Sequence, residues 1–91
     1  MEVGRVAGAV WATRKAEGLE GRKLLLVELW DVGENRPIPG PYRVAADVIG
    51  AGVGERVLLV SGSAARRAMG EESAPVDGAV VAILDGWEAK G

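Results

Sequence analysis

The sequence predicts an all-β fold, a small five-stranded Greek-key barrel with one short helix. Two observations support this prediction. Short runs of β-branched and aliphatic residues recur between glycine and proline turn signals, as in antiparallel barrels. The chain has 14 glycines, no phenylalanine, three tryptophans and one tyrosine, which predicts many turns and an interior of small aliphatic side chains.

Residues 1–91 are expected to form a single domain. A chain of this length buries only about 60 to 65% of the surface that it exposes when unfolded, so its core is thin. Small scaffolds of this kind often gain further burial by oligomerising. We therefore expect a barrel that assembles with copies of itself.

The sequence predicts five strands, which cover residues 2–13, 23–32, 42–46, 56–61 and 78–87. In the first strand, Gly4 and Gly8 predict a bend or bulge, because glycine inside a strand usually marks one. Simple alternation places Val6 and Val10 on one side of this strand and Ala9 on the other. Five strands and one helix resemble the oligonucleotide/oligosaccharide-binding fold, or OB fold.

The second strand contains an apolar run, Leu24–Val27, which has hydrophobic residues on both faces. Both faces need cover, and a chain this small cannot sandwich a strand by itself. A neighbouring subunit is one source of the second cover. The alternative is partial exposure of one or two of the leucines.

The remaining segments are predicted to be loops and one helix. Residues 14–22 form a charged loop, and residues 33–41 form a hairpin loop in which three prolines prevent further strand pairing. A short helix is expected to start with Ser63 as its N-cap, to run to Met69 and to end at Gly70. Residues 71–75 are a polar connection.

The most informative stretch runs from residue 44 to residue 67, where Gly50, Gly52 and Gly54 alternate in the turn between two strands. Glycine permits positive φ or a close backbone approach, so the turn is expected to be tight. A dinucleotide-binding loop is excluded because a strand, not a helix, is predicted after these glycines. The corner at residues 61–67 lacks the Gly-Lys-Ser/Thr ending of a phosphate loop.

Several motifs of this stretch resemble the EutN/CcmL family of bacterial microcompartment vertex proteins. The matching motifs are Val44–Asp47, Gly50–Leu58 and Gly62–Arg66, flanked by residues 8–15, 19–27 and 75–85. They follow one another in the family's order and cover nearly the whole chain. One departure is Ala64, which stands where the family more often has a second serine.

The resemblance implies a structural protein that forms a cyclic homopentamer at the vertices of a cytoplasmic microcompartment shell, next to hexameric shell proteins. We expect the turn to build the subunit interface, because alternate glycines allow close approach. The interface candidates are Asp47, Gly50, Gly52, Gly54, Glu55 and Arg66. The small residues Gly62, Ser63 and Ala64 are candidates for the axial pore, since a small corner lets five copies converge.

Composition argues against other functions. The chain lacks histidine and cysteine, so no imidazole or thiolate chemistry is available, and we expect no catalytic residue, cofactor or metal site. Asp47, Asp77 and Asp85 are not spaced like a calcium loop. Residues 1–5 do not resemble a signal peptide, and no run is apolar enough to span a membrane.

Two alternatives remain open. Trp11, Trp30 and Tyr42 would stack bases if the barrel bound single-stranded nucleic acid or another ligand, but the net charge of −2 disfavours nucleic acid, and burial or subunit packing is the simpler explanation. Serines 61 and 63 beside Arg66 and Arg67 would form an anion-receiving corner. The simpler explanation is that Ser63 caps the helix and that the arginines are solvated or paired across an interface.

Overall fold

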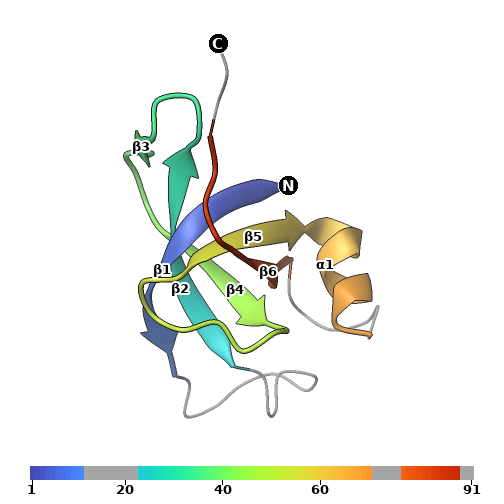
Figure 1. The fold of residues 1–91 in the computed structure, drawn as a ribbon. Coiled ribbons are helices and arrows are strands. Elements are labelled where there is room, and N and C mark those ends of the chain that lie inside the picture. Colours follow the sequence, from blue (N-terminus) through green and yellow to red (C-terminus); the bar gives the residue numbers. More distant parts are fainter. Residues whose placement is uncertain (12–22, 71–76, 89–91) are drawn as a thin grey trace.

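Five long strands wind into a closed barrel with one short helix at its end (Figure 1). The computed structural model describes residues 1–11, 23–70 and 77–88. In chain order the elements are β1 (Glu2–Val10), β2 (Leu24–Asp31), β3 (Arg36–Pro37), β4 (Arg43–Asp47), β5 (Arg56–Ser61), α1 (Gly62–Ala68) and β6 (Gly78–Leu84). The predicted all-β fold with one short helix is confirmed.

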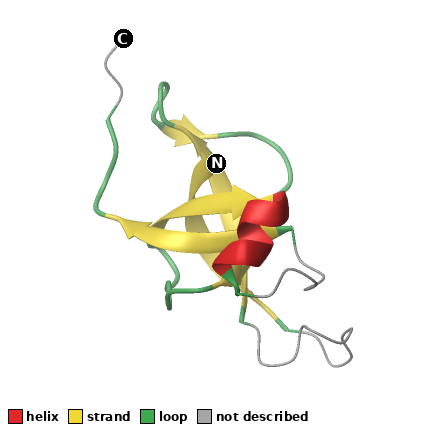
Figure 2. Ribbon diagram, turned by 90° about the vertical axis from the view of Figure 1, so that its right-hand side faces the viewer, coloured by secondary structure: helices red, strands yellow, loops and turns green. Residues whose placement is uncertain are grey.

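Strand pairing closes the barrel. The strand order is β1-β5-β6-β4-β2, and β1 also pairs with β2, which joins the two ends of the sheet. All pairs of long strands are antiparallel except β4 with β6, which is parallel. Helix α1 lies beside the barrel and packs against β5 and β6 (Figure 2). This pairing is the order of the OB fold, and a closed ring leaves none of the five long strands as a free edge.

Small aliphatic side chains fill the barrel, as the composition predicts. The buried core cluster consists of Val6, Leu25, Val27, Ala45, Ala51, Val57, Leu59 and Val80. Ala65 is the buried residue of α1. Without larger side chains the core is narrow.

A bulge in β1 changes which residues face the core. The register of β1 against β2 shifts between Val6 and Gly8, so Val6 lies opposite Val27 while Ala9 lies opposite Leu25. Ala9 therefore packs against the core on the same side as Val6. The predicted irregularity near Gly8 is confirmed, but the placement of Ala9 on the opposite side is wrong, because simple alternation does not allow for the extra residue of a bulge.

The hairpin after β2 is more regular than predicted. Pro37 was expected to prevent pairing, yet β3 pairs with β2 through Arg36 opposite Asp31 and Pro37 opposite Trp30. Proline lacks only its own N–H and is tolerated in an edge strand, and the next residue, Ile38, donates its N–H to the carbonyl of Leu29 at 2.8 Å. The hairpin extends beyond the barrel (Figure 1).

Other boundaries differ by a few residues. The first strand ends at Val10, and the last ends at Leu84 instead of residue 87. The fourth long strand matches its predicted range. The predicted loop at 14–22, the connection at 71–75 and residues 12 and 13 of the predicted first strand lie outside the described residues. No helix in the described ranges is long and apolar enough to cross a membrane.

We expect Gly4 to be essential for barrel closure. Its position is buried, and a Cβ there would overlap the carbonyl oxygen of Glu28 and lie 2.7 Å from Cγ1 of Val27. Gly4→Ala should lower the free energy of unfolding by about 1–3 kcal/mol, the usual cost of overpacking. Urea unfolding at a fixed protein concentration measures this change.

Gly8→Ala is the matched control, because no atom lies within 4 Å of a Cβ at that position. It should change the free energy of unfolding by no more than about 0.5 kcal/mol. Equal effects of the two substitutions would contradict the assignment of Gly4 to a close strand contact.

Candidate functional site

The loop at residues 48–55, between β4 and β5, is organised around one carboxylate. Oδ1 of Asp47 accepts the backbone N–H groups of Ile49, Gly50 and Ala51 at 3.1, 2.9 and 3.2 Å. The Asp47 side chain is only 2% exposed, and its Oδ2 lies 3.6 Å from Nζ of Lys23. Nζ of Lys23 also donates to the carbonyl of Ala51 at 3.2 Å. Asp47 therefore fixes the first half of the loop.

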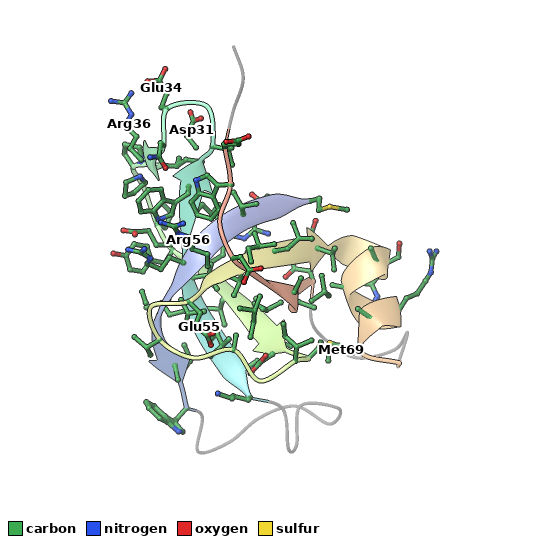
Figure 3. The ribbon with its side chains drawn as sticks, viewed as in Figure 1. Asp31, Glu34, Arg36, Glu55, Arg56 and Met69 are labelled. Carbon is green, nitrogen blue, oxygen red and sulfur yellow. The ribbon has the colours of Figure 1, made fainter. Side chains whose placement is uncertain are left out.

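A second carboxylate fixes the other half. Oε1 of Glu55 accepts the N–H of Gly52 at 2.6 Å, and the N–H of Glu55 donates to the carbonyl of Gly52 at 3.1 Å. The loop is also bonded to β1, because Gly54 donates to the carbonyl of Val6 at 2.8 Å and Val6 donates to the carbonyl of Glu55 at 3.0 Å. Figure 3 labels Glu55 at this junction. The loop is thus a fixed part of the barrel.

The glycines of the loop have separate roles. Gly50 and Gly54 have φ of 80° and 88°, in the left-handed region that favours glycine. Gly52 lacks a positive φ, and a Cβ there would lie 3.3 Å from Oε1 of Glu55. The predicted tight turn is confirmed. At Gly50 and Gly54 no atom lies within 4 Å of an added Cβ, so both glycines leave open space on the loop surface.

The outside of the loop is apolar, which sequence reasoning missed. The carboxylates of Asp47 and Glu55 bond to the loop's own backbone, whereas Val48, Ile49 and Val53 are exposed, Val53 to 71%. An exposed apolar group of this kind is a common sign of an interaction surface. The available signal was the Val-Ile pair between an aspartate and a glycine, which is unusual for a solvated turn.

The outer face of β2 is also apolar. Leu25 and Val27 are buried in the core, while Leu24 and Leu26 are half-buried on the opposite face. Val44 of β4 lies opposite Leu26 in the sheet and is 48% exposed. Both faces of the predicted apolar run are therefore hydrophobic, and within one chain the outer face is only partly covered.

The corner between β5 and α1 differs from the prediction. Helix α1 begins at Gly62, with Ser61 at the N-cap position and no side-chain capping bond, so Ser63 is not the N-cap. Gly62 has φ of 62°, which lets the chain turn from strand to helix without a linker, and its N–H donates to the carbonyl of Asp77 at 2.8 Å. Ser63 and Ala64 are exposed.

The end of α1 agrees with the prediction. Met69 donates its N–H to the carbonyl of Ala65, and Gly70, with φ of 73°, donates to the carbonyl of Arg67. Glycine in the left-handed region is a common helix stop. Arg66 and Arg67 lie in the last turn, where positive charge favours the helix dipole.

The predicted site residues fall into two groups. Asp47, at the end of β4, lies with Glu55 and the three glycines at the loop before β5, whereas the pore candidates lie after β5, at its other end (Figure 1). Arg66 is half-buried on α1. Among residues 1–11, 23–70 and 77–88, no three acidic side chains are grouped so as to hold a metal ion.

Two tryptophans and two arginines form a further cluster on the outside of the barrel. The ring centroids of Trp30 and Trp87 are 5.6 Å apart, with the rings tilted by 54°. Cζ of Arg5 lies 5.5 Å from the Trp30 centroid, and Cζ of Arg56 lies 5.0 Å from that of Trp87. Packing therefore accounts for Trp30, as predicted. Trp11 is 87% exposed, so burial within the chain does not account for it.

Comparison of the sequence with models of known protein families gives a match over most of the chain. Residues 1–85 match the family model described as ethanolamine utilisation protein EutN/carboxysome. The chain belongs to the EutN/CcmL family. The resemblance drawn from the sequence motifs is confirmed.

Related EutN/CcmL proteins cover almost the whole chain. The carboxysome shell vertex protein CcmL of Gloeobacter violaceus is 46% identical over 93% of this chain and 83% of its own. The microcompartment shell vertex protein EutN of Salmonella typhimurium is 47% identical over 93% of this chain and 84% of its own. The similarity therefore extends over both the loop and the helix corner.

Solved structures of the family have the same fold. The structure of Gloeobacter violaceus CcmL has a TM-score of 0.89 at 44% identity and covers 98% of this chain and 90% of its own. GrpN, a pentameric microcompartment shell protein from Rhodospirillum rubrum, has a TM-score of 0.86 at 39% identity and covers 99% of this chain and 100% of its own.

Asp47 is expected to be the main support of the loop. Asp47→Ala removes the acceptor of three backbone N–H groups, and hydrogen bonds to a charged group contribute strongly to stability. We expect the free energy of unfolding to fall by about 2 kcal/mol. Amide exchange at residues 49–51 should become faster than in the unmodified protein.

Lys23→Met is the control, because it removes the ion pair to Asp47 and the bond to the Ala51 carbonyl but leaves the three N–H bonds to Asp47 in place. The Lys23 side chain is 56% exposed, so its loss should cost less than about 1 kcal/mol. If the lysine variant proved as unstable as Asp47→Ala, the contacts of Lys23 and not the amide bonds to Asp47 would be the main support of the loop.

Proposed function

We propose that this chain is a structural vertex protein of a bacterial microcompartment shell. The observation that carries the proposal is family membership over residues 1–85, together with 46–47% identity to proteins named as shell vertex proteins. Residues 1–91 act as one barrel domain, and the shell lies in the cytoplasm. The role is mechanical, so it requires no catalytic group and no cofactor.

Five copies assemble into a closed ring. A cyclic ring repeats one heterologous contact, in which one patch of each subunit meets a different patch of the next. The similarity to a pentameric shell protein supports this number. The partly covered apolar face of Leu24, Leu26 and Val44 supplies surface that a neighbour would bury.

The loop at residues 48–55 contributes to the subunit contact. Asp47 and Glu55 hold the loop in shape, Val48, Ile49 and Val53 meet the neighbour, and the open space at Gly50 and Gly54 permits close approach. Gly52 leaves room for the carboxylate of Glu55. Arg66 of α1 is a further interface group.

The corner at the start of α1 surrounds the axis of the ring. Gly62, Ser63 and Ala64 are small, and the last two are exposed. Small residues allow five copies of this corner to converge and leave an axial opening between them. The loop and this corner lie at opposite ends of β5, so one subunit can reach its neighbour and the axis simultaneously.

The ring has a geometric function. A flat sheet of hexameric tiles does not close, and five-fold units placed at its corners introduce the curvature that closure requires. The partners of the pentamer are accordingly hexameric shell proteins. Neither nucleic acid nor a membrane takes part in this role.

Shell closure tests the proposal directly. The chain should be produced together with the hexameric shell proteins of its own organism, and the particles imaged by electron microscopy. We expect closed polyhedra with this protein at the corners, and open sheets or tubes when it is omitted. Gly8→Ala provides a control, since no atom lies within 4 Å of an added Cβ there, and it should still give closed polyhedra. Closed shells in the absence of this chain would contradict the vertex role.

A further inference from the structure

We propose that Arg5 and Arg56 form a binding site for a small oxyanion, a carboxylate or a phosphate, on the outer face of the barrel. This site begins where the loop at residues 48–55 ends, at the end of β5 opposite the helix corner. It concerns the cluster of Arg5, Trp30, Trp87 and Arg56, which the vertex role does not use.

The two arginines are adjacent in the sheet. Arg5 of β1 lies directly opposite Arg56 of β5 in an antiparallel pair, so the two side chains leave the sheet on the same face. Each guanidinium stacks on one tryptophan of the pair Trp30–Trp87. Gly86 leaves room for Arg56, because a Cβ there would lie 3.3 Å from one terminal nitrogen of Arg56. Figure 3 labels Arg56 below the hairpin that carries Asp31 and Arg36.

Neither arginine has an acidic partner in the part of the chain that the structure describes. Glu28 lies opposite Arg5 on the other side of β1 and is the natural candidate. In the structure, however, its carboxylate is hydrogen-bonded to other groups: Oε1 accepts the indole N–H of Trp30 and Oε2 accepts the hydroxyl of Tyr42, both at 3.3 Å. The Nε of Arg5 is buried and has no acceptor.

The pairing of Arg5 with Arg56 is energetically unfavourable in the isolated chain. Like charges directly opposite one another in a sheet are destabilising, and a buried N–H without an acceptor adds to the cost. Stacking on the tryptophans compensates only in part. The contrast is Arg43, which has a carboxylate partner in Glu2 at 3.0 Å. An anion from outside the chain would neutralise the two charges of the cluster.

The chemistry favours a small oxyanion over a polyanion. Guanidinium groups donate two parallel N–H bonds to carboxylate or phosphate oxygens, and two of them side by side match a group with two or more oxygens. Both side chains are partly exposed, so an anion can approach them. A nucleic acid would need a longer basic track, and here the carboxylate of Glu28 borders the pair while the whole chain carries a net charge of −2.

Tryptophan fluorescence provides the test, because Trp30 and Trp87 contact the arginines directly. The assembled protein with Trp11→Phe, which removes the exposed third tryptophan, is titrated with inorganic phosphate and separately with succinate. Sodium chloride at matched ionic strength is the reference. We expect a saturable change in fluorescence with phosphate, with succinate or with both, and none with chloride. The anion that binds more tightly shows whether the ligand is a phosphate or a carboxylate.

Variants assign the response to the cluster. Arg5→Gln and Arg56→Gln should each weaken binding about tenfold or more, in line with the loss of a charge-assisted hydrogen bond. Arg5→Lys keeps the positive charge but loses the two parallel N–H donors of the guanidinium group, so it should weaken binding while the fold is retained. Arg36→Gln, on the exposed strand β3, removes the same charge and should leave binding unchanged.

Three results would overturn the proposal. One is a response that chloride reproduces, and another is binding that survives both Arg5→Gln and Arg56→Gln. The third is that these variants lose subunit assembly while the unmodified protein shows no response to phosphate or succinate. In that case the anion is a carboxylate of a second subunit, and the cluster is an assembly contact instead of a ligand site.

Discussion

One constraint governs the structure: a single chain is too small to bury all of its hydrophobic side chains. With a core of alanine, valine and leucine, the barrel is narrow, and strand β2 is hydrophobic on its outer face as well. Leu25 and Val27 face inward, whereas Leu24 and Leu26 face outward and stay partly exposed. At about 25 cal/mol per Å² of buried apolar surface, covering such a face is a strong driving force for association. The small size of the chain thus favours assembly.

The loop before β5 solves a related problem. An interaction surface must be apolar, yet a loop carries many backbone polar groups that need partners. Asp47 and Glu55 satisfy these groups from within, which leaves Val48 and Val53 free to face outward. The carboxylates therefore act on the proposed contact through the shape of the loop, and the glycines supply the backbone angles that this shape requires.

Local patterns predicted most of the strands, because glycine and aliphatic residues alternate clearly, as in β5. Local patterns gave wrong predictions at two places. The bulge in β1 turns Ala9 toward the core, and α1 begins at Gly62 instead of after Ser63. The glycines predicted the tight loop before β5, but nothing in the sequence analysis predicted that its valines would be exposed. The cluster of Arg5 and Trp87 was missed because its members come from distant strands, and no spacing in the sequence brings them together.

The apolar outer surface is expected to close a ring of identical subunits. The most direct measurement is the mass of the purified protein by native mass spectrometry. We expect one species of five chains of 9.5 kDa, about 47.5 kDa in total. A stable monomer would contradict this expectation, because the apolar face that includes Val44 would then be exposed to water.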